Sequence, residues 1–213
     1  MLFRSVIGAE GLNFGVCYPL PEFDRRSVMW DLNYFKYNFL KTTGMGFRED
    51  LLEDDFEHLA HDLLQKPWDT FMYRDFQSRN VMLSNSLPYF IDFQGGRKGP
   101  VYYDVASFLW QAKANFPEEL REELIATYIE SLQKYRPVNK SVFLKRLSLF
   151  VLFRTLQVLG AYGFRGFFEK KPHFIQSVPY ALGNLRDLLK KGFDAYPYLC
   201  RMLHKMKIGR AHV

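Results

Sequence analysis

The stretch "FMYRDFQSRNVMLSNSLPYFIDFQGG", residues 71–96, places three polar side chains beside short apolar runs. Asp75 follows "TFMY", Asn80 begins "NVMLS", and Asp92 ends "PYFID". We predict that the three runs are short strands, and that the turn residues 85–88 close a hairpin between the last two. Because a hairpin returns the chain on itself, Asp92 is expected to lie beside Asn80, with Asp75 on the loop that precedes them.

Phosphoryl transfer requires side chains of these types. It needs a residue that orients the attacking hydroxyl and accepts its proton, and a metal ion that holds the phosphates. Magnesium prefers oxygen ligands, often one or two from the protein. We also expect Gly95 and Gly96 to allow a sharp turn. Asp104 is expected near a helix start, where a carboxylate can accept backbone N–H bonds.

The ordered motifs resemble those of a known family. "YRDFQSRN" is similar to the His-Arg-Asp-x-x-x-x-Asn loop of the protein-kinase-like superfamily, and "IDFQGG" to its metal-binding Asp-Phe-Gly. "GPVYYDVASFL" resembles an element of the aminoglycoside phosphotransferase and choline kinase branch. Within that branch the loop is similar to bacterial N-acetylmuramate/N-acetylglucosamine anomeric sugar kinases. The stretches "PLPEFDRRSVMWDLNYF" and "LFRTLQVLGAYGF" extend the resemblance to residues 17–195.

The resemblance implies a role for each matching residue. Asp75 would be the catalytic base, or would orient the acceptor hydroxyl. Asn80 and Asp92 would bind Mg²⁺ and, through it, ATP. Arg74 and Asp104 would support the loop. Candidate substrate residues are Gln77, Arg79, Asp31, Arg25 and Arg26, although Arg79 could equally contact phosphate or brace the loop.

Three positions depart from the family pattern. Tyr73 stands where the superfamily usually has His, at a position that is mainly structural. Gln77 stands where protein kinases often have Lys and this branch often has His. A neutral amide there can hydrogen-bond a phosphate or sugar but cannot act through charge. Gln94 replaces the Gly of Asp-Phe-Gly, as is common in this branch.

Both ends of the chain resemble sequencing adapters. "IGRAHV", residues 208–213, is encoded by ATC GGA AGA GCA CAC GTC, and residues 1–5 match ATG CTC TTC CGA TCT, which holds the reverse complement of the same core. We exclude both segments and assign residues 6–207 to a phosphotransferase domain. There is no room before residue 17 for a nucleotide-binding lobe with its Gly-rich loop and Lys. We therefore expect a C-terminal lobe that is inactive by itself.

Outside the loop, apolar spacing predicts helices. Ser27 is expected to cap one over 28–41, and Asp50 another over 51–66 that ends at Pro67. The residues expected on their buried sides are Trp30, Leu32, Phe35 and Phe39, then Leu52, Phe56, Leu59 and Leu63. Residues 6–26 are expected to be extended, and further helices are expected over 103–114, 117–134, 141–162 and 174–191. The predicted fold is therefore α+β and protein-kinase-like: a mostly helical C-terminal lobe with a small β insert that carries the catalytic loop, the N-terminal nucleotide lobe being missing.

Composition argues against several other classes. The 29 basic and 23 acidic residues give a charge of +6, which falls to +4 without Arg4 and Arg210. The basic residues are scattered, so no nucleic-acid partner is predicted. No apolar run reaches the length of a membrane span. Cys17 and Cys200 are far apart in sequence, which is typical of a reduced compartment, and a cytoplasmic location is the default.

The predicted function is an ATP- and Mg²⁺-dependent small-molecule kinase. Its acceptor would be a hydroxyl of a sugar or amino sugar, with the anomeric hydroxyl as the specific prediction. The alternative is a pseudokinase or regulatory binding module that keeps the motif for its fold.

The paired His58 and His61 could bind a metal, but a solvated helix face is favoured because no third ligand is evident. The aromatic runs 30–39 and 162–168 are read as core rather than as a ligand site. The oligomeric state stays open.

Overall fold

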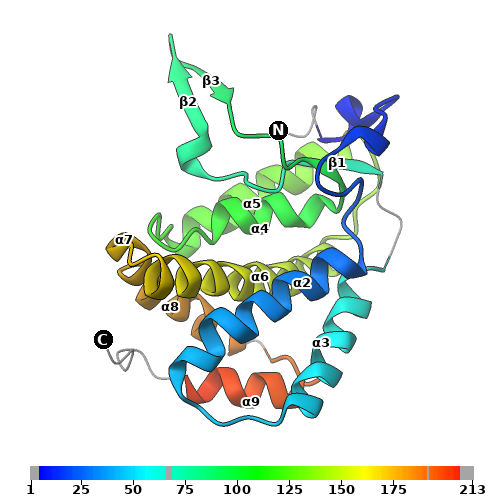
Figure 1. The fold of residues 1–213 in the computed structure, drawn as a ribbon. Helices are drawn as coiled ribbons and strands as arrows, with labels where there is room; N and C mark the ends of the chain where they lie inside the picture. The colour runs from blue at the N-terminus through cyan, green and yellow to red at the C-terminus, as the bar shows by residue number, and fades with distance from the viewer. Residues whose placement is uncertain (1–4, 66–68, 191, 207–213) are drawn as a thin grey trace. The chain divides into compact units, whose positions relative to one another are not determined.

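The computed structural model describes residues 5–65, 69–190 and 192–206, and it confirms an α+β architecture (Figure 1). The chain divides into two compact units, one made of Met1–Phe23 with Lys66–Phe150 and the other of Asp24–Gln65 with Val151–Val213. All the described strands belong to the first unit. Of the two proposed adapter segments, only Ser5 is described; residues 1–4, 208–213 and the predicted helix stop at Pro67 lie outside the described residues.

Two small antiparallel sheets organise the first unit. β1 (Thr70–Met72) pairs with β4 (Arg97–Gly99), and β2 (Val81–Ser84) pairs with β3 (Leu87–Phe90). The β2–β3 turn has two residues, Asn85 and Ser86, both with positive φ, instead of the four expected. Asn tolerates this left-handed conformation, which suits a tight hairpin, so Leu87 and Pro88 join β3.

Helices and short turns complete the first unit. α4 (Val101–Leu109), α5 (Glu118–Gln133) and the first part of α6 (Lys140–Gly163) follow the sheets, and the predicted bounds of α5 and α6 are right to within one residue at each end. α4 ends five residues before the predicted 114. The segment expected to be extended contains the 3₁₀ turns η1 (Ile7–Ala9) and η2 (Phe14–Val16). Its end pairs with β4 through Phe23, whose N–H donates to the Lys98 carbonyl at 2.8 Å.

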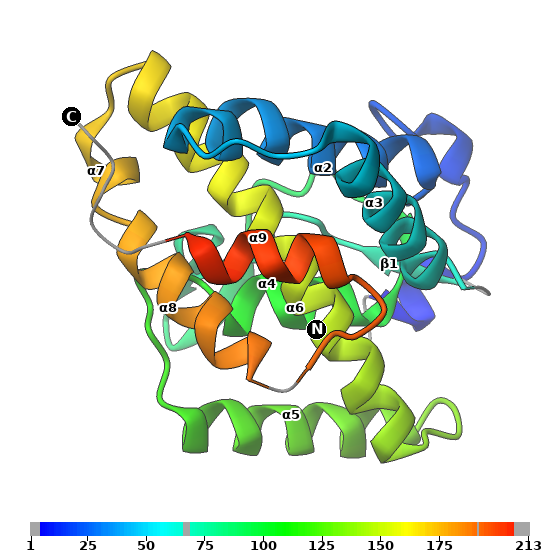
Figure 2. The same ribbon diagram turned by 90° about the horizontal axis from the view of Figure 1, so that it is seen from below.

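The regular elements described in the second unit are all helices. Its first half contains α2 (Arg25–Phe35), the π-helical η3 (Lys36–Leu40), the 3₁₀ turn η4 (Lys41–Thr43) and α3 (Glu49–Leu63). Its second half contains the end of α6, the π-helical η6 (Phe164–Phe168), α7 (Pro172–Ile175), α8 (Val178–Leu189) and α9 (Pro197–Lys205). α9 packs on α3 (Figure 2). The buried Asp55 on α3 accepts the Leu199 N–H at 2.7 Å and so holds the first turn of α9.

Two helix predictions in this unit were wrong in detail. Asp24 caps α2, not Ser27, which is the third helical residue and completes a capping box with Asp24. Trp30 is 65% exposed, whereas the other three residues expected on the buried side are buried. α3 begins at Glu49, so Asp50 is inside its first turn and pairs with Arg48. The buried face of α3 is confirmed, since its four predicted apolar residues are fully buried.

Residues Lys140–Phe168 form a continuous helical stretch of 29 residues that is long and apolar enough to cross a membrane by length and composition. Among the described residues it is the one helix that meets this test. The prediction that no apolar run reaches the length of a membrane span was therefore wrong. Of its most apolar window, 61% is buried inside the protein. Core helices of soluble proteins pass the same test, so this burial favours a core helix.

Candidate functional site

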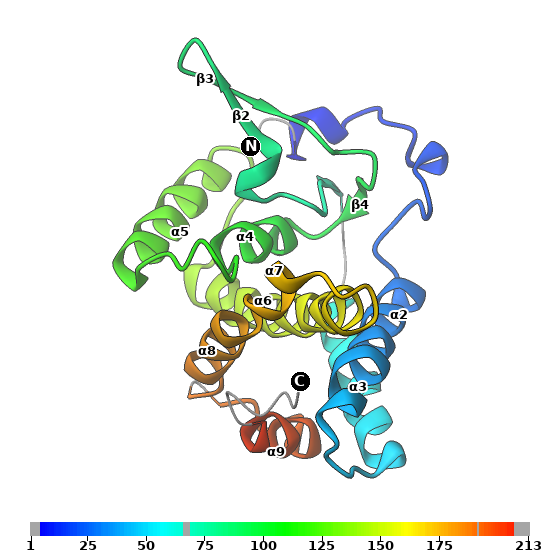
Figure 3. The same cartoon turned by 60° about the vertical axis from the view of Figure 1, so that its left-hand side comes forward.

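The loop between β1 and β2 lies beside α4 (Figure 3), and a carboxylate on α4 holds it. Arg74 has φ +76, a left-handed conformation that is uncommon for a residue with a side chain. The Asp104 carboxylate, 2% exposed, accepts the backbone N–H of Tyr73 at 2.6 Å and that of Arg74 at 2.9 Å. Hydrogen bonds to a charged acceptor are the stronger kind. They stabilise this backbone at the residue before Asp75.

The Asn80 side chain connects the loop to the segment after the hairpin. Asn80 is buried in the 3₁₀ turn η5 (Ser78–Asn80), one residue before the strand in which it was expected. Its Nδ2 donates to the Asp75 carbonyl at 2.8 Å and to Asp92 Oδ2 at 3.2 Å. The Ile91 N–H donates to the Asn80 carbonyl at 3.1 Å. The amide thus brings together the backbone of Asp75 and the carboxylate of Asp92.

Asp92 lies beyond the strand that it was expected to end. β3 stops at Phe90, and Asp92 follows with φ +69 and an exposed side chain. Its Oδ1 accepts a hydrogen bond from Gln94 Nε2 at 2.7 Å. In the part of the chain that the structure describes, neither Asp92 nor the half-buried Asp75 forms an ion pair. No cation among the described residues therefore compensates either carboxylate.

Contacts made by Tyr73 and Ser78 also support the loop, and the sequence analysis did not predict them. The Tyr73 hydroxyl donates to the Ile91 carbonyl, and its ring packs edge-on against Phe93. Both the N–H and the hydroxyl of Ser78 donate to Gln111 Oε1, each at 2.8 Å. Tyr73 and Gln94 depart from the family pattern, and this departure is a signal that the sequence itself offers. The sequence offers no such signal for Gln111, because it lies 33 residues from its partner Ser78.

The candidate substrate residues fall into two groups. Gln77 is half-buried and Arg79 exposed, and both lie on the loop that contains Asp75. Asp31 and Arg25 belong to α2 in the second unit, where Arg25 forms an exposed ion pair with Glu57.

Gly96 closes a turn, and its missing side chain is also needed for close packing. The turn that the sequence predicted at Gly95 and Gly96 is present, since the Gly96 N–H donates to the Phe93 carbonyl at 2.8 Å, although neither glycine has a positive φ. A Cβ on Gly96 would lie 2.2 Å from the Phe71 ring and 2.9 Å from the Phe93 carbonyl oxygen. The left-handed conformation is adopted by Asp92 instead. The absence of a side chain at Gly96 lets this segment pack on β1.

We expect Gly96→Ala to lower the free energy of unfolding by about 2 kcal/mol, because Phe71 and the backbone must shift to accommodate the methyl group. Urea unfolding of the two proteins measures this difference. The matched control is Gly46→Ala, since a Cβ there meets nothing within 4 Å. Equal midpoints for the Gly96 and Gly46 variants would contradict the packing argument.

The donor set at the loop suits magnesium. One carboxylate, Asp92, and one side-chain amide, Asn80, lie within 3.2 Å of each other, and magnesium commonly takes one or two protein oxygen ligands. Asn80 Nδ2 faces protein oxygens, so its amide oxygen points to the other side. Among the described residues no group of three His, Cys, Asp or Glu is placed to hold a metal. His58 and His61 are both exposed on α3, as expected of a solvated face.

An exposed apolar surface adjoins this site. The β2–β3 hairpin and the residues after it, which we call the hairpin surface, extend from the helices of the first unit (Figure 3). Its large apolar side chains are Met82, Leu83, Leu87, Tyr89, Ile91 and Phe93, all exposed. In the β2–β3 register, Met82, Leu87 and Tyr89 lie on one face of the hairpin and Leu83 on the other. Exposed apolar side chains that share a face can mark an interaction site.

Comparison with known proteins identifies the class. The phosphotransferase enzyme family matches residues 21–138, more than half of the chain. The chain therefore belongs to this family, and the resemblance seen in the sequence is confirmed. The matched range contains the whole loop, the hairpin and α4.

Three relatives of this chain share the same name. N-acetylmuramate/N-acetylglucosamine kinase of Neisseria meningitidis serogroup B is 28% identical over 185 residues, which are 84% of this chain and 55% of the relative. The kinase of the same name from Pseudomonas aeruginosa is 30% identical over 57% of this chain and 36% of the relative. That from Pseudomonas putida is 25% identical over 80% and 52%. The chain thus spans about half the length of these relatives or less.

Proposed function

We propose that this chain is the C-terminal lobe of an ATP- and Mg²⁺-dependent kinase that phosphorylates a hydroxyl of a sugar or amino sugar. The observation that carries the proposal is the Asn80 amide, which joins the backbone of Asp75 to the carboxylate of Asp92. Family membership and relatives named as amino-sugar kinases support the reaction class. Our specific proposal for the acceptor is the anomeric hydroxyl of an N-acetylated amino sugar.

In this proposal Asp75 orients the acceptor hydroxyl and accepts its proton. A general base must be within hydrogen-bonding reach of that proton, and the half-buried Asp75 carboxylate is both accessible and unpaired with any cation among the described residues. Asp104 fixes the loop through Tyr73 and Arg74. We propose Gln77 and Arg79, on the same loop, as contacts of the substrate. Asp31, on α2 in the second unit, is proposed separately as a substrate residue.

Asn80 and Asp92 are the proposed ligands of Mg²⁺, and through it of ATP. When bound, the ion offsets the negative charge of the phosphates. The contribution of the chain is to hold the two ligands together: the Asn80 amide donates to Asp92 Oδ2, and Gln94 donates to Oδ1. These neutral donors orient the carboxylate without cancelling its charge. Ligands whose partners fix their orientation bind metals more tightly.

The hairpin surface supports the proposal that residues 6–207 form one lobe of a larger enzyme. A nucleotide-binding lobe would cover the face of the hairpin that carries Met82, Leu87 and Tyr89. The 213-residue chain alone is then expected to be inactive. A cytoplasmic location is proposed because both Cys17 and Cys200 are free thiols.

We expect Asp92→Ala in the complete enzyme to raise the dissociation constant of Mg²⁺–ATP at least about tenfold, because one of two protein ligands is lost. Calorimetry with and without Mg²⁺ measures the change. Asp54→Ala, on the exposed face of α3, is the control and should bind as the unmodified enzyme does. Unchanged Mg²⁺–ATP affinity in the Asp92 variant would refute the ligand assignment.

The overall function is tested by incubating the complete enzyme with Mg²⁺–ATP and N-acetylated amino sugars and following ADP release. Acceptor-dependent ADP release is expected. If the enzyme binds Mg²⁺–ATP but transfers phosphate to no hydroxyl acceptor, the kinase proposal fails, and a regulatory module with a kinase-like fold replaces it.

A further inference from the structure

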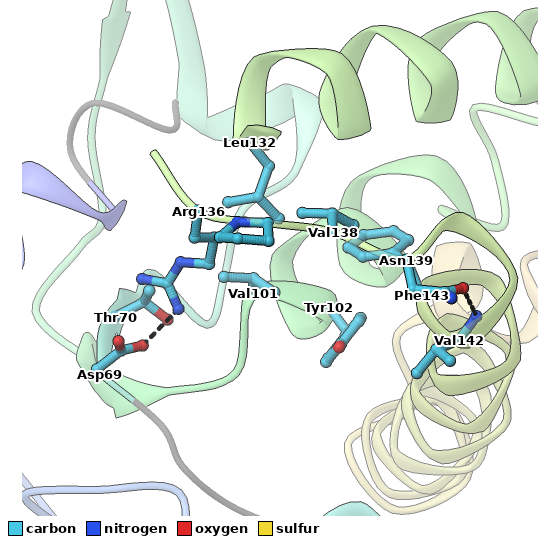
Figure 4. Close-up of a pocket in the computed structure, with 11 residues that line it drawn as sticks. Asp69, Thr70, Val101, Tyr102, Leu132, Arg136, Val138, Asn139, Val142 and Phe143 are labelled. Carbon is cyan, nitrogen blue, oxygen red and sulfur yellow. Dashed lines mark hydrogen bonds and ion pairs between the residues drawn. The ribbon is translucent and has the colours of Figure 1, made fainter. Parts of the chain in front are cut away.

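A cavity of about 230 Å³ lies in the first unit, apart from the loop residues described above (Figure 4). It is formed by the starts of β1 and α4, the segment after α5 and the first turn of α6. None of the proposed catalytic or metal-binding residues lines it. Drug-sized ligands occupy cavities of about 300–1,000 Å³. An apolar cavity of about 150 Å³ can hold a benzene molecule, so this one has room for a compact ring and a small polar group.

The two ends of the cavity differ in chemistry. Arg136 and Asp69 lie at one end and Val142 and Phe143 at the other (Figure 4). Arg136 Nη1 pairs with Asp69 Oδ1 at 2.7 Å. The Nε of Arg136 is buried and has no hydrogen-bond partner within the described residues. Because Nε has no surface that faces open space, a ligand in the cavity would accept hydrogen bonds from the accessible part of the Arg136 guanidinium and not from Nε.

The charges around the cavity favour an anion. Arg136 lines it, and the Arg146 guanidinium lies 5.5 Å from the centre of the Tyr102 ring, which also lines it. The one acidic lining residue is Asp69, whose side chain is 58% exposed at the rim. Burial raises the pKa of the Tyr102 hydroxyl, while the positive charges of Arg146 and Arg136 act in the opposite direction. Both arginines therefore contribute positive electrostatic potential at Tyr102, which lines the cavity.

We propose that this cavity binds a small organic carboxylate whose apolar body packs against Val142 and Phe143 while its carboxylate accepts hydrogen bonds from Arg136. Arginine is suited to this because its planar guanidinium matches the geometry of a carboxylate. The ligand contacts the residues that begin β1 and α4, at Thr70 and Val101. These two elements lead to the loop and to Asp104, so occupancy stabilises the elements that hold the loop in place.

The test titrates benzoate into the full 213-residue chain and follows amide NMR signals. We expect saturable binding with a dissociation constant of about 1 mM, as befits a ligand of this size, and signal changes centred on Thr70, Val101 and Val142. Benzamide has the same shape without the charge and should bind at least about tenfold more weakly, because charge-assisted hydrogen bonds are lost. Equal affinities for the two probes would overturn the proposal, as would the absence of saturable benzoate binding.

Two variants locate the site independently. Arg136→Gln removes the cation and should weaken benzoate at least about tenfold; its partner Asp69 remains solvated. Val142→Phe places a ring into the cavity from a residue that is 53% exposed, so the fold tolerates it, and benzoate binding should be lost. Leu144→Phe, also exposed on α6 but not lining the cavity, is the control. Unchanged benzoate affinity in both the Arg136 and Val142 variants would show that benzoate binds elsewhere and would refute the site.

Discussion

Asp75→Asn in the complete enzyme is expected to lower turnover by a factor of about 10²–10⁴, the range by which a positioned general acid or base accelerates a reaction. The amide keeps the shape of the carboxylate but cannot accept a proton. The loop should be undisturbed, because Asn80 contacts the backbone carbonyl of Asp75 and not its side chain. Turnover measured at saturating Mg²⁺–ATP isolates the chemical role.

Two comparisons make this expectation sharp. Asp187→Asn changes an exposed aspartate on α8 that pairs only with the neighbouring Lys190 among the described residues, and its turnover should be unchanged. The Mg²⁺–ATP affinity of the Asp75 variant should also be nearly unchanged, because the proposed metal ligands are untouched. Near-normal turnover in the Asp75→Asn variant would refute the proposal that Asp75 accepts the proton of the acceptor hydroxyl. Parallel loss of nucleotide affinity would point to a damaged loop instead.

Local patterns in the sequence predicted much of the fold. The helical spacing of apolar residues in α3 identified its buried face, because that spacing is set by the helix itself. The order of Asp, Asn and Asp around short apolar runs likewise indicated the loop and hairpin. These predictions needed only residues close together in the chain, where backbone geometry decides which side chains share a face.

Features that depend on distant residues could not be predicted this way. β4 consists of Arg97, Lys98 and Gly99, which have little strand character, and it exists because it pairs with β1, 27 residues earlier. Lys36 is fully buried on an apolar helix because Glu49 and Glu53 reach its ammonium group at 2.9 Å. Buried charges need such partners.

The supporting shell of the site has the same origin. Gln111, two residues beyond the end of α4, reaches Ser78, and the absence of a side chain at Gly96 makes room for the ring of Phe71. Each contact joins segments whose proximity only the tertiary fold creates. Sequence motifs therefore identified the residues proposed to carry the chemistry, whereas the residues that hold them in place appeared only in three dimensions.

Asp104→Ala is expected to lower the free energy of unfolding of the chain by about 3 kcal/mol, because two backbone donors lose a charged, buried acceptor. The variant lacks these two hydrogen bonds, so they no longer offset the energetic cost of the left-handed conformation of Arg74. Denaturant unfolding gives the stability, and hydrogen exchange at the Tyr73 and Arg74 amides reports the loop directly. Both amides should lose protection even under conditions where the rest of the chain stays folded.

Asp55→Ala separates loop support from general destabilisation. Asp55 is also a buried aspartate that accepts a backbone N–H, that of Leu199, but it belongs to the second unit. Its loss should destabilise α9 while leaving the exchange of the Tyr73 and Arg74 amides unchanged. In the complete enzyme, Asp104→Ala should reduce turnover well below that of Asp55→Ala at a temperature where both are folded. If the two variants lose activity equally, Asp104 contributes only to stability, and the loop keeps its conformation without it.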